Sequence, residues 1–509
     1  MAKIMNSNFY SPVKLVGLCL VVALTACGGG SNDTPVTAVD PVVPEPPVVV
    51  PTPVNPGIPS NNRIEPLDLG LPKAASAASL KASERSAALP PASVRLGPVG
   101  ESQSLLTKNA AGYGAPQQIG VSRSVVATAT AKDTLAQLTW RPAGSGLQRA
   151  AISFTADGAL GVRLGVLVRS LPSGSTMRFY AQSGGNFVQV SREEVLRIVQ
   201  RNLDAGDVGD SARTYWAPDF GGAETTLELE VPVRANLAEL DIAVPSLSHF
   251  VVSPEQATAS ASFTKVGESG TCNVDVSCKA EFTSESRSVA RMIYVRDGGS
   301  FLCTGTLLND IQSSTTPYFL SAFHCISSQS VASSLTTDWF YRSTACNSGS
   351  LNLATQRLQG GAVLLHASAT TDTSFMRLNN PPPQGSVYAG TYFGDMTQNA
   401  NVAGVHHPRG DLQKVSTGAL ARFSNCSNEV CAISTPADGR FLTVGWSEGT
   451  TEGGSSGSGL FFGIGSSRYL VGQLYGGASS CQVPAGRDHY GRFDLAFRSA
   501  LKQWLVPGS

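Results

Sequence analysis

The stretch Gly454-Ser455-Ser456-Gly457-Ser458 predicts a tight turn that exposes a serine hydroxyl. Glycines on both sides of Ser456 supply the backbone freedom that such a turn needs. A histidine, His324, and an aspartate, Asp372, precede this turn in the chain. The order His, Asp, Ser is one of the orders in which catalytic triads occur. The sequence therefore predicts that Ser456 is a nucleophile, that His324 is its base and that Asp372 orients the imidazole.

The surroundings of the three residues suit these roles. The backbone N–H groups of Gly454 and Ser456 are expected to face a developing oxyanion, where such donors are worth a few kcal/mol each. His324 follows an apolar run and adjoins Cys325, and a disulfide at that cysteine would hold the histidine backbone still. Asp372 precedes an apolar segment, and burial there would keep its carboxylate aimed at the imidazole.

A second interpretation of the turn is a lipase-like elbow formed by residues 453–457. That arrangement requires a histidine after the serine in the chain. Only His489 qualifies, and its segment is better explained in another way given below. The adjacent pair His406 and His407 has no third ligand nearby and is interpreted as a structural strand end.

The composition favours an exported protein rich in β structure. The chain has 509 residues, so more than one domain is expected. The formal net charge is zero and only 15% of the residues are charged, which gives no electrostatic reason to expect a nucleic-acid partner. Residues 266–509 contain short strand-like runs separated by Gly and Ser turns, a pattern typical of a β-barrel or sandwich.

Eight of the ten cysteines lie after residue 271. Their confinement to one part of an exported chain predicts four disulfides. Zinc binding is the alternative, but no Cys-x2-Cys pair occurs with a His-x3-His spacing, and we predict no metal site. Spacing alone does not choose among the many possible pairings. The eight are Cys272, Cys278, Cys303, Cys325, Cys346, Cys426, Cys431 and Cys481.

Residues 1–27 have the form of a bacterial signal peptide. Lys3 and Lys14 give a positive start, and the apolar run that follows is too short to cross a bilayer. The run ends in Leu24-Thr25-Ala26-Cys27-Gly28. This ending resembles a lipobox, which implies that a lipid is attached to Cys27. An ordinary secretory signal with an unrelated cysteine is the alternative.

The lipobox resemblance also implies a destination. Gly28, rather than Asp, follows Cys27, which favours the outer membrane. Residues 28–60 are rich in Gly and Pro and are expected to form an extended tether without a core.

Residues 61–265 predict a mainly β domain of the sandwich type. Their composition shows no cluster of His, Cys and carboxylates, so no catalytic role is expected here. Between residues 235 and 264 there is no Lys or Arg, and Lys265 stands alone after a linker-like segment. Alternation favours strands at 135–140, 161–168, 177–180 and 226–231, and the pattern favours helices at 80–89 and 193–202.

Six ordered stretches of the C-terminal half carry a resemblance to a known family. They are Thr271-Cys272-Asn273-Val274-Asp275-Val276-Ser277-Cys278, Cys303-Thr304-Gly305-Thr306-Leu307-Leu308-Asn309, Tyr318-Phe319-Leu320-Ser321-Ala322-Phe323-His324-Cys325, Val405-His406-His407-Pro408, Gly454-Ser455-Ser456-Gly457-Ser458 and Gly472-Gln473-Leu474-Tyr475-Gly476-Gly477-Ala478-Ser479-Ser480-Cys481. Together they resemble the lysyl endopeptidase family, which includes protease Lys-C. The resemblance covers essentially all of residues 266–509, and the earlier residues match the family plan of a leader and a long propeptide by position.

The resemblance implies an all-β, chymotrypsin-like fold with two six-stranded antiparallel β-barrels in the C-terminal half, preceded by a mainly β propeptide. It implies the same triad, His324, Asp372 and Ser456, in the cleft between the barrels, and no cofactor. It also implies the pairings Cys272–Cys481, Cys278–Cys346 and Cys303–Cys325. Cys426 and Cys431 then remain for each other.

The resemblance further implies a lysine-binding pocket. Trypsin-like enzymes carry a carboxylate six residues before the nucleophile, but that position here is Thr450. Lysyl endopeptidases use the Asp of an Asp-x-Tyr-Gly-Arg stretch, which matches Asp488, and Glu452 matches a second acidic residue of the pocket. A buried carboxylate binds an ammonium through charge-assisted hydrogen bonds. A loop salt bridge of Asp488 with Arg487 or Arg492 is the alternative.

A pocket for lysine would let the enzyme cut its own chain at Lys265–Val266. The new N-terminus would then lie shortly before Cys272, as in the family. Chymotrypsin-like zymogens capture that terminus with an Asp immediately before the nucleophile. Ser455 stands there instead, so activation is expected to depend on loss of the propeptide.

The chain departs from the family at several positions. Tyr475 stands where well-known members carry His, and Gly459 replaces a Pro after the serine motif. The Trp that pairs with that His has no clear equivalent, because residues 424–426 occupy its region. These departures concern the rate, the pH optimum and the preference for Lys over Arg.

The sequence thus predicts an exported serine endopeptidase that cuts proteins or peptides after Lys, with Arg as a further choice. Its expected domains are a signal peptide (1–27), a tether (28–60), a propeptide (61–265) and a protease (266–509). The precursor is expected at the outer membrane through Cys27, and the mature protease is expected as a released monomer. The alternatives are an inactive protease-fold adhesin, or a structural lipoprotein whose β domain is the functional part.

Overall fold

The computed structural model describes residues 62–70, 91–100, 116–185, 187–252 and 269–507. The signal peptide with Cys27, the tether, the helix expected at 80–89 and Lys265 lie outside these ranges. In the described part of the chain, no helix is both long and apolar enough to cross a membrane.

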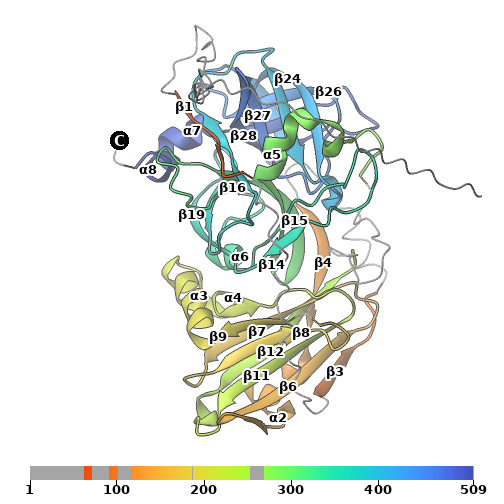
Figure 1. The fold of residues 1–509 in the computed structure, drawn as a ribbon, viewed down its shortest axis with the longest axis vertical. Coiled ribbons are helices and arrows are strands. Elements are labelled where there is room, and N and C mark those ends of the chain that lie inside the picture. The colour runs from red at the N-terminus through yellow and green to blue at the C-terminus, as the bar shows by residue number, and fades with distance from the viewer. Residues whose placement is uncertain (1–61, 71–90, 101–115, 186, 253–268, 508–509) are drawn as a thin grey trace, which may run out of the picture. The chain divides into compact units, whose positions relative to one another are not determined.

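Residues 91–100, 116–185 and 187–252 form a β-sandwich (Figure 1). One sheet has the order β3-β6-β11-β8-β9 with β5 beside β6, and the other contains β10-β7-β12-β4. Apolar side chains from both sheets, such as Phe154 and Leu164, form the core between them. The strands are β3 (Ala92–Leu96), β4 (Gln117–Ser124), β5 (Arg141–Gly144), β6 (Leu147–Ala156), β7 (Val162–Ser170), β8 (Thr176–Tyr180), β9 (Phe187–Ser191), β10 (Thr214–Trp216), β11 (Glu224–Pro232) and β12 (Asp241–Phe250).

In the sandwich, one predicted helix is confirmed and one predicted strand is a helix instead. The helix expected at 193–202 is α3 (Arg192–Asp204), with Ser191 as its N-cap. The strand expected at 135–140 is wrong, because residues 131–137 form α2 (Ala131–Gln137). Thr130 caps this helix by accepting a hydrogen bond from the Asp133 N–H at 3.2 Å. The cap satisfies a helix-end donor and outweighs the strand-like alternation of the last few residues. A short helix, α4 (Gly209–Ala212), follows α3.

The C-terminal part contains a closed six-stranded barrel. Its ring runs β28-β27-β23-β24-β26-β29 and returns to β28, so this barrel has no free edge. β25 extends β24 into a hairpin, and short helices follow β29. The elements are β22 (Gly390–Tyr392), β23 (Asn401–His406), β24 (Lys414–Ser427), β25 (Val430–Ser434), β26 (Phe441–Glu448), β27 (Gly459–Ile464), β28 (Ser467–Gly477), β29 (Asp488–Arg492), α7 (Phe493–Ala496) and α8 (Lys502–Leu505).

The preceding strands form an open half-barrel in the order β18-β17-β14-β15-β16-β20-β19. At the β19 end, the Gln329 side chain donates to the Ala362 carbonyl and accepts from the Leu364 N–H, both at 2.8 Å. The predicted all-β two-barrel protease fold is confirmed, with this barrel open. The elements are α5 (Thr283–Ser288), β14 (Val289–Arg296), β15 (Gly299–Leu308), β16 (Tyr318–Ala322), α6 (Gln329–Ser333), β17 (Thr336–Trp339), β18 (Gln356–Leu358), β19 (Ala362–Ser368) and β20 (Thr373–Leu378).

One sheet is shared by the sandwich and the half-barrel. β4 pairs with β12 on one side and with β15 on the other. Its pairing with β15 is antiparallel and joins Gly120 to Ser300, Gln118 to Phe301 and Gln117 to Leu302. Figure 1 shows β4 beside β15.

Residues 62–70 lie against the barrels and not in the sandwich. β1 (Arg63–Ile64) pairs with β22, and β2 (Leu67–Asp68) pairs with β21 (Val387–Tyr388). We call residues 62–70 the strap. Strands of two residues carry no readable alternation, so nothing in the sequence pattern pointed to them.

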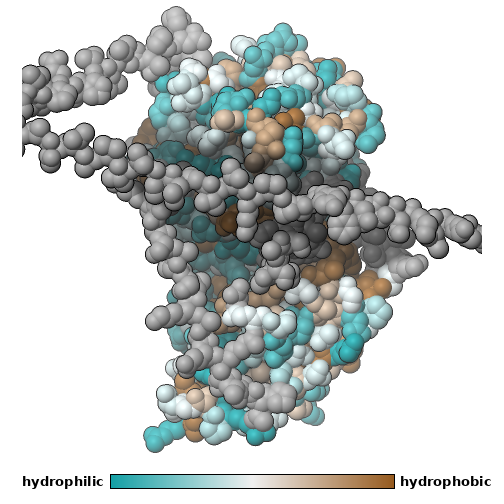
Figure 2. Space-filling model, turned by 45° about the vertical axis from the view of Figure 1, so that its right-hand side comes forward, coloured by the Kyte–Doolittle hydropathy of each residue, from teal (hydrophilic) through white to brown (hydrophobic). Residues whose placement is uncertain are grey.

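The structure contains four disulfides, with the same pairings that the family resemblance implies: Cys272–Cys481, Cys278–Cys346, Cys303–Cys325 and Cys426–Cys431. The first closes the longest loop, with a sequence separation of 209, and long loops give the largest loss of unfolded-state entropy. On the face in Figure 2, hydrophilic and hydrophobic residues are interspersed in small groups.

Candidate active site

The structure brings His324 and Asp372 into direct contact. The imidazole Nδ1 lies 2.8 Å from Oδ2 of Asp372, and the His324 backbone N–H donates to Oδ1 at 3.0 Å. This contact makes Nδ1 the protonated nitrogen and leaves the lone pair on Nε2. Nε2 is buried and has no hydrogen-bond partner among the described residues, so it is available to take a proton.

Asp372 has an unusual backbone. Its φ is +50°, in the left-handed region that Asp tolerates better than most residues because its short side chain can bond locally. Its carbonyl accepts from the Phe323 N–H at 3.0 Å, while its carboxylate binds His324. Gln473 Nε2 also donates to the carbonyls of Thr371 and Asp372, at 2.7 and 3.2 Å. The strained aspartate is therefore fixed by both barrels.

Ser456 lies on the turn after β26 and is held beside the histidine segment. Its carbonyl accepts from the Thr304 N–H at 2.8 Å. Thr304 follows Cys303, whose disulfide to Cys325 anchors the residue after His324. Gly457, with φ +80°, approaches so closely that an added Cβ would lie 2.1 Å from the Ser321 hydroxyl and 2.6 Å from the Thr304 carbonyl. Any side chain here would push the turn away from the histidine strand.

The two predicted oxyanion donors are each fixed through the carbonyl of their own peptide unit. In a planar trans peptide the N–H points opposite to the C=O. The Gly453 carbonyl accepts from the Arg409 N–H at 2.5 Å, which orients the Gly454 N–H. The Ser455 carbonyl accepts from the Ser458 N–H at 3.0 Å, which orients the Ser456 N–H. Neither N–H has an acceptor among the described residues, so both remain available for an oxyanion.

His406, interpreted from the sequence as a strand end, contacts this turn directly. Its Nδ1 lies 2.8 Å from the Ser455 hydroxyl and its Nε2 lies 3.1 Å from the Ser416 hydroxyl. Ser416 donates to the Thr450 carbonyl at 2.7 Å, so Nε2 must be the donor to Ser416 and Nδ1 the acceptor from Ser455. Burial lowers the pKa of His406 to about 3, with His407 and Lys414 adding to the effect. A neutral imidazole thus accepts a hydrogen bond from the Ser455 hydroxyl. Chymotrypsin-like zymogens carry an Asp at this position, before the nucleophile.

Replacing His406 by Leu should lower kcat roughly tenfold to a hundredfold with little change in KM, because the oxyanion donors lose order while the substrate pocket remains. His406→Asn keeps an acceptor near the Nδ1 position and should retain more activity. Steady-state kinetics on a peptide amide measures both. His489→Leu removes a buried histidine that bonds Ser424 and Thr443 instead, and controls for lost stability. A higher KM with unchanged kcat would contradict this role.

Asp488 lies at the start of β29 and is completely buried. Its Oδ2 accepts from Trp446 Nε1 at 2.6 Å, from the Thr451 hydroxyl at 2.7 Å and from the Ser479 hydroxyl. Its Oδ1 accepts only from the Ser479 N–H at 3.3 Å among the bonds of the described residues. Burial raises the pKa of the Asp488 carboxyl, and these hydrogen bonds oppose the rise. No ion pair joins Asp488 to Arg487 or Arg492 in the described part of the chain.

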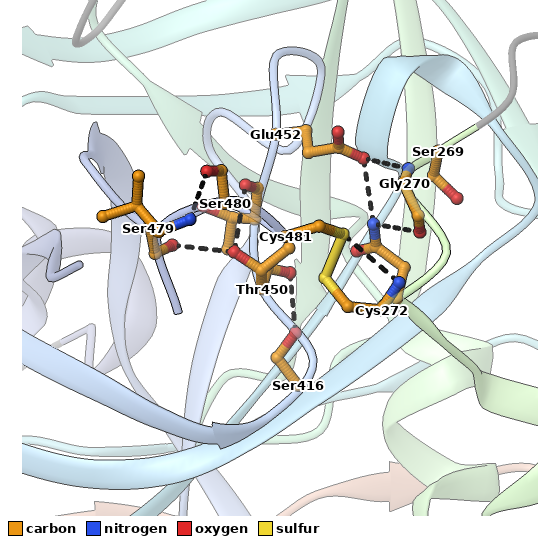
Figure 3. The surroundings of a disulfide bond; sticks show 12 residues. Ser269, Gly270, Cys272, Ser416, Thr450, Glu452, Ser479, Ser480 and Cys481 are labelled. Atoms are coloured by element: carbon orange, nitrogen blue, oxygen red, sulfur yellow. Dashed lines mark hydrogen bonds between the residues drawn. A yellow bond between two sulfur atoms is a disulfide. The ribbon is translucent and has the colours of Figure 1, made fainter. Parts of the chain in front are cut away.

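Glu452 binds the segment that follows the proposed cleavage point. Its Oε2 accepts from the Gly270 N–H at 2.8 Å and from Asn273 Nδ2 at 2.9 Å, and Oε1 pairs with Arg409 at 3.1 Å. Figure 3 shows this carboxylate beside the Cys272–Cys481 disulfide. The geometry therefore places Glu452 on residues 270–273, and a role in the lysine pocket stays a prediction.

Tyr475 has an aromatic partner that the sequence did not reveal. Its ring meets His324 edge-on at 5.9 Å between centroids and packs on Phe441 at 5.4 Å. The Glu429 N–H, in the turn closed by Cys426–Cys431, donates to the Tyr475 hydroxyl at 3.3 Å. Phe441 is at the start of β26, far from Tyr475 in sequence, and gave no motif.

Among the described residues, two groups of His and Cys have their possible metal-ligand atoms close together within the group. They are Cys303-His324-Cys325 and Cys426-Cys431-His489. In both, the cysteines are joined in a disulfide and offer no thiolate. His489 lies with Ser424 and Thr443, and its contacts give no support to a lipase-like elbow.

A two-barrel fold with a serine turn, a histidine and a buried aspartate at one place defines a serine endopeptidase. The chain belongs to the lysyl endopeptidase family. Residues 95–251 match the family model "Lysyl endopeptidase N-terminal domain" and residues 266–491 match "Lysyl endopeptidase, C-terminal domain". A lysyl endopeptidase of Pseudomonas aeruginosa is 32% identical over 412 residues, which are 77% of this chain and 82% of the relative.

Solved structures that are similar to part of the chain are also serine proteases. A thermostable serine protease, AL20, from an extremophilic microorganism is 11% identical with a TM-score of 0.28, over 42% of this chain and 95% of that one. The HtrA-type protease AlgW with a tripeptide is 13% identical with a TM-score of 0.30, over 44% of this chain and 62% of that one.

Proposed function

We propose that the protein is an exported serine endopeptidase that cleaves peptide bonds after lysine. The observation that carries the proposal is the hydrogen bonding of Asp488, whose Oδ2 receives three donors while Oδ1 receives one. A carboxylate has about four acceptor positions in all, so the free capacity lies on a single oxygen. This arrangement suits one ammonium and does not suit a guanidinium, which pairs best with both oxygens at once.

A lysine side chain has to reach a carboxylate that is fully buried. The hydroxyls of Thr451 and Ser479 cap it, and Thr450 donates to Ser479 at 3.0 Å. A hydroxyl has two acceptor lone pairs, so Thr451 and Ser479 can each accept from an ammonium while still donating to Oδ2. Three hydroxyls and one carboxylate would then surround the lysine nitrogen, and this supports Lys ahead of Arg.

The proposed reaction is acyl transfer to serine followed by hydrolysis. Ser456 Oγ attacks the scissile carbonyl while His324 Nε2 takes its proton, and Asp372 stabilises the imidazolium. The N–H groups of Gly454 and Ser456 bind the oxyanion. His324 then donates its proton to the leaving amine, and a water molecule repeats the sequence on the acyl-enzyme. Paired peptides that differ only in Lys or Arg before the scissile bond test the preference.

We also propose that the sandwich restrains the enzyme until the chain is cut at Lys265. β4 occupies the edge of β15, and its Gln117 side chain lies so close to Gly453 that an added Cβ there would be 2.9 Å from Oε1. Pro116, next to it, is buried. The sandwich thus lies directly beside the oxyanion turn, where it obstructs an extended substrate.

Lys265→Ala should leave the chain uncut at this point and lower peptide hydrolysis at least tenfold. A recognition site for an unrelated protease, placed within residues 253–268, should restore activity when that protease is added. N-terminal sequencing and a peptide assay measure the two effects. Normal maturation of Lys265→Ala would contradict self-processing, and full activity of the uncut chain would contradict the restraint.

Export and a lipid at Cys27 complete the proposal. The support is the leader sequence, in which a short apolar run ends in a lipobox-like Leu24-Thr25-Ala26-Cys27. Radiolabelled palmitate should enter the precursor and not the Cys27→Ser variant.

A further inference from the structure

We propose that the strap, residues 62–70, is a permanent part of the protease and stays bound to it after the chain is cut. Through the strap, the protease domain then remains attached to the tether and the lipid at Cys27 and is not released. The inference rests on the proposed processing and lipid anchor only for its second part. The strap itself is argued from contacts within the described residues.

Backbone hydrogen bonds join the strap to both ends of the segment 387–393. Arg63 and Ile64 pair with Tyr392 and Thr391, and the Phe393 N–H donates to the Asn62 carbonyl at 2.9 Å. Further along, β2 pairs with β21. Between the two ladders, Asn309 Nδ2 donates to the Glu65 carbonyl at 3.0 Å. An added strand of this kind gains affinity from its main chain alone.

The apolar contacts show that the strap fills the protease core. Ile64 is only 1% exposed and belongs to the hydrophobic cluster that contains Leu320 of β16 and Leu470 of β28. These strands come from different barrels, so Ile64 packs where the barrels meet. Leu67 packs against the core of the half-barrel. Departure of the strap would leave a cavity at the first site, which destabilises a protein beyond the lost burial.

A buried charge also depends on the strap. Arg287 of α5 has a side chain that is 8% exposed, and its two terminal nitrogens bind the two oxygens of Asp68 at 2.7 Å each. Its Nε donates to the Gly385 carbonyl at 2.6 Å. Without Asp68, a guanidinium that is 8% exposed would lose its carboxylate, which destabilises the fold, although the Asp68 side chain is 46% exposed and water screens part of the pair.

At Gly390 of the protease, the strap leaves no space for a side chain. A Cβ on Gly390 would lie 2.6 Å from the Ile64 carbonyl oxygen and 2.8 Å from Pro66. The backbone of Gly390 is not in the left-handed region, so its conformation does not require glycine. A side chain at position 390 would instead occupy the space that the strap fills.

The strap can remain without blocking the reaction. In the described ranges, no hydrogen bond or ion pair joins residues 62–70 to His324, Asp372, Ser456 or Asp488. The sandwich differs in this respect, because β4 lies beside the oxyanion turn. The two N-terminal parts therefore have separate roles once a second cut falls between them, within residues 71–90, where Lys73 and Lys81 lie. The sandwich is then removed to open the site, and the strap stays.

The test uses the full chain with Ser456→Ala and a C-terminal affinity tag. Recognition sites for an unrelated protease are placed within residues 71–90 and 253–268, so the result does not depend on cutting at Lys265. After cleavage, the tagged protease domain is washed and analysed by denaturing mass spectrometry. We expect a fragment containing residues 62–70 in a near one-to-one ratio. Recovery of that fragment in the wash, with the sandwich, would overturn the proposal.

Variants separate the strap from general damage. Ile64→Asp in the strap and Gly390→Val in the protease should each raise the loss of the fragment at least tenfold and lower Tm by on the order of 10 °C. Asp157→Asn breaks an exposed ion pair with Arg95 in the sandwich and should change neither value. Retention of the fragment by Gly390→Val, with an unchanged Tm, would also overturn the proposal.

Cell fractionation tests the anchor. In the active chain, the protease domain should sediment with membranes, and Gly390→Val should move it to the medium. Cys27→Ser should release the protease and the fragment together, still bound to each other. If Cys27→Ser leaves the fractionation unchanged, the lipid anchor is wrong while the strap stands. If Gly390→Val stays with the membranes although its fragment is lost, the strap is not the attachment.

Discussion

Ser456→Ala should lower kcat for peptide hydrolysis about 10⁴- to 10⁶-fold, the range seen when a triad nucleophile is removed. The hydroxyl is the only group of the site that forms the covalent intermediate. The oxyanion donors remain, because they are fixed through Arg409 and Ser458 and not through the Ser456 side chain. When the variant and the wild type are both cut by an unrelated protease at a site placed within residues 253–268, residual hydrolysis and an unchanged affinity for a non-cleaved peptide are therefore expected.

The measurement is a burst and steady-state assay on a peptide amide, with unfolding temperature as the control for folding. An unchanged Tm is expected because Ser456 makes its recorded structural bond through its carbonyl. Hydrolysis at the wild-type rate would defeat the mechanism. A wild-type protein that cleaves nothing would favour the rival function, an inactive protease fold that binds at a surface.

Asp488→Asn should lower kcat/KM for lysine substrates roughly 10²- to 10³-fold, because a buried ammonium without its carboxylate costs about 3–5 kcal/mol. Asparagine is close in size and its carbonyl oxygen can still accept from Trp446, Thr451 and Ser479. The pocket should therefore keep its shape and lose its charge. In chains cut by an unrelated protease at a site placed within residues 253–268, substrates with an uncharged residue before the scissile bond should be affected much less.

Glu452→Gln is the matched control, since the family resemblance implies that both carboxylates belong to the pocket. Glu452 is bonded to Gly270, Asn273 and Arg409, so its loss should reduce stability and leave the ratio of Lys to Arg cleavage unchanged. Competing peptides in one mixture measure this ratio. If the ratio of Lys to Arg cleavage changes with Glu452→Gln and not with Asp488→Asn, then Glu452 and not Asp488 is the carboxylate that binds lysine.

The strands of the protease part and the roles of His324 and Asp372 could be predicted because their signals are local, whereas the two-barrel arrangement is implied by the family resemblance. Short strand-like runs separated by Gly and Ser turns mark β14, β16, β26 and β28, and short motifs surround each candidate catalytic residue. Alternation failed at α2, where the side chain of Thr130 decides the structure by capping a helix. A helix cap is a single hydrogen bond, and the spacing of apolar residues does not reveal it.

The strap and the His406 contact could not be read from the sequence because both depend on residues far apart in the chain. Ile64 looks like any apolar residue in a Pro-rich region, and its burial arises from strands more than two hundred residues later. His406 and Ser455 are 49 residues apart and meet only after the second barrel closes. Proton positions in such a network follow from partners in space.

The pairing of β4 with β15 bears on which substrates can be cut. If the sandwich departs as proposed, residues 300–302 become an open sheet edge with unpaired backbone groups on the strand that also bonds the Ser456 carbonyl through Thr304. An incoming polypeptide can satisfy these groups only as an added strand, with several consecutive residues extended. Helices and the inner strands of folded proteins cannot take this form without unfolding. If the enzyme cleaves after lysine as proposed, lysines in loops and in unfolded chains are then its accessible targets. The backbone conformation around a lysine would decide whether it can be cut.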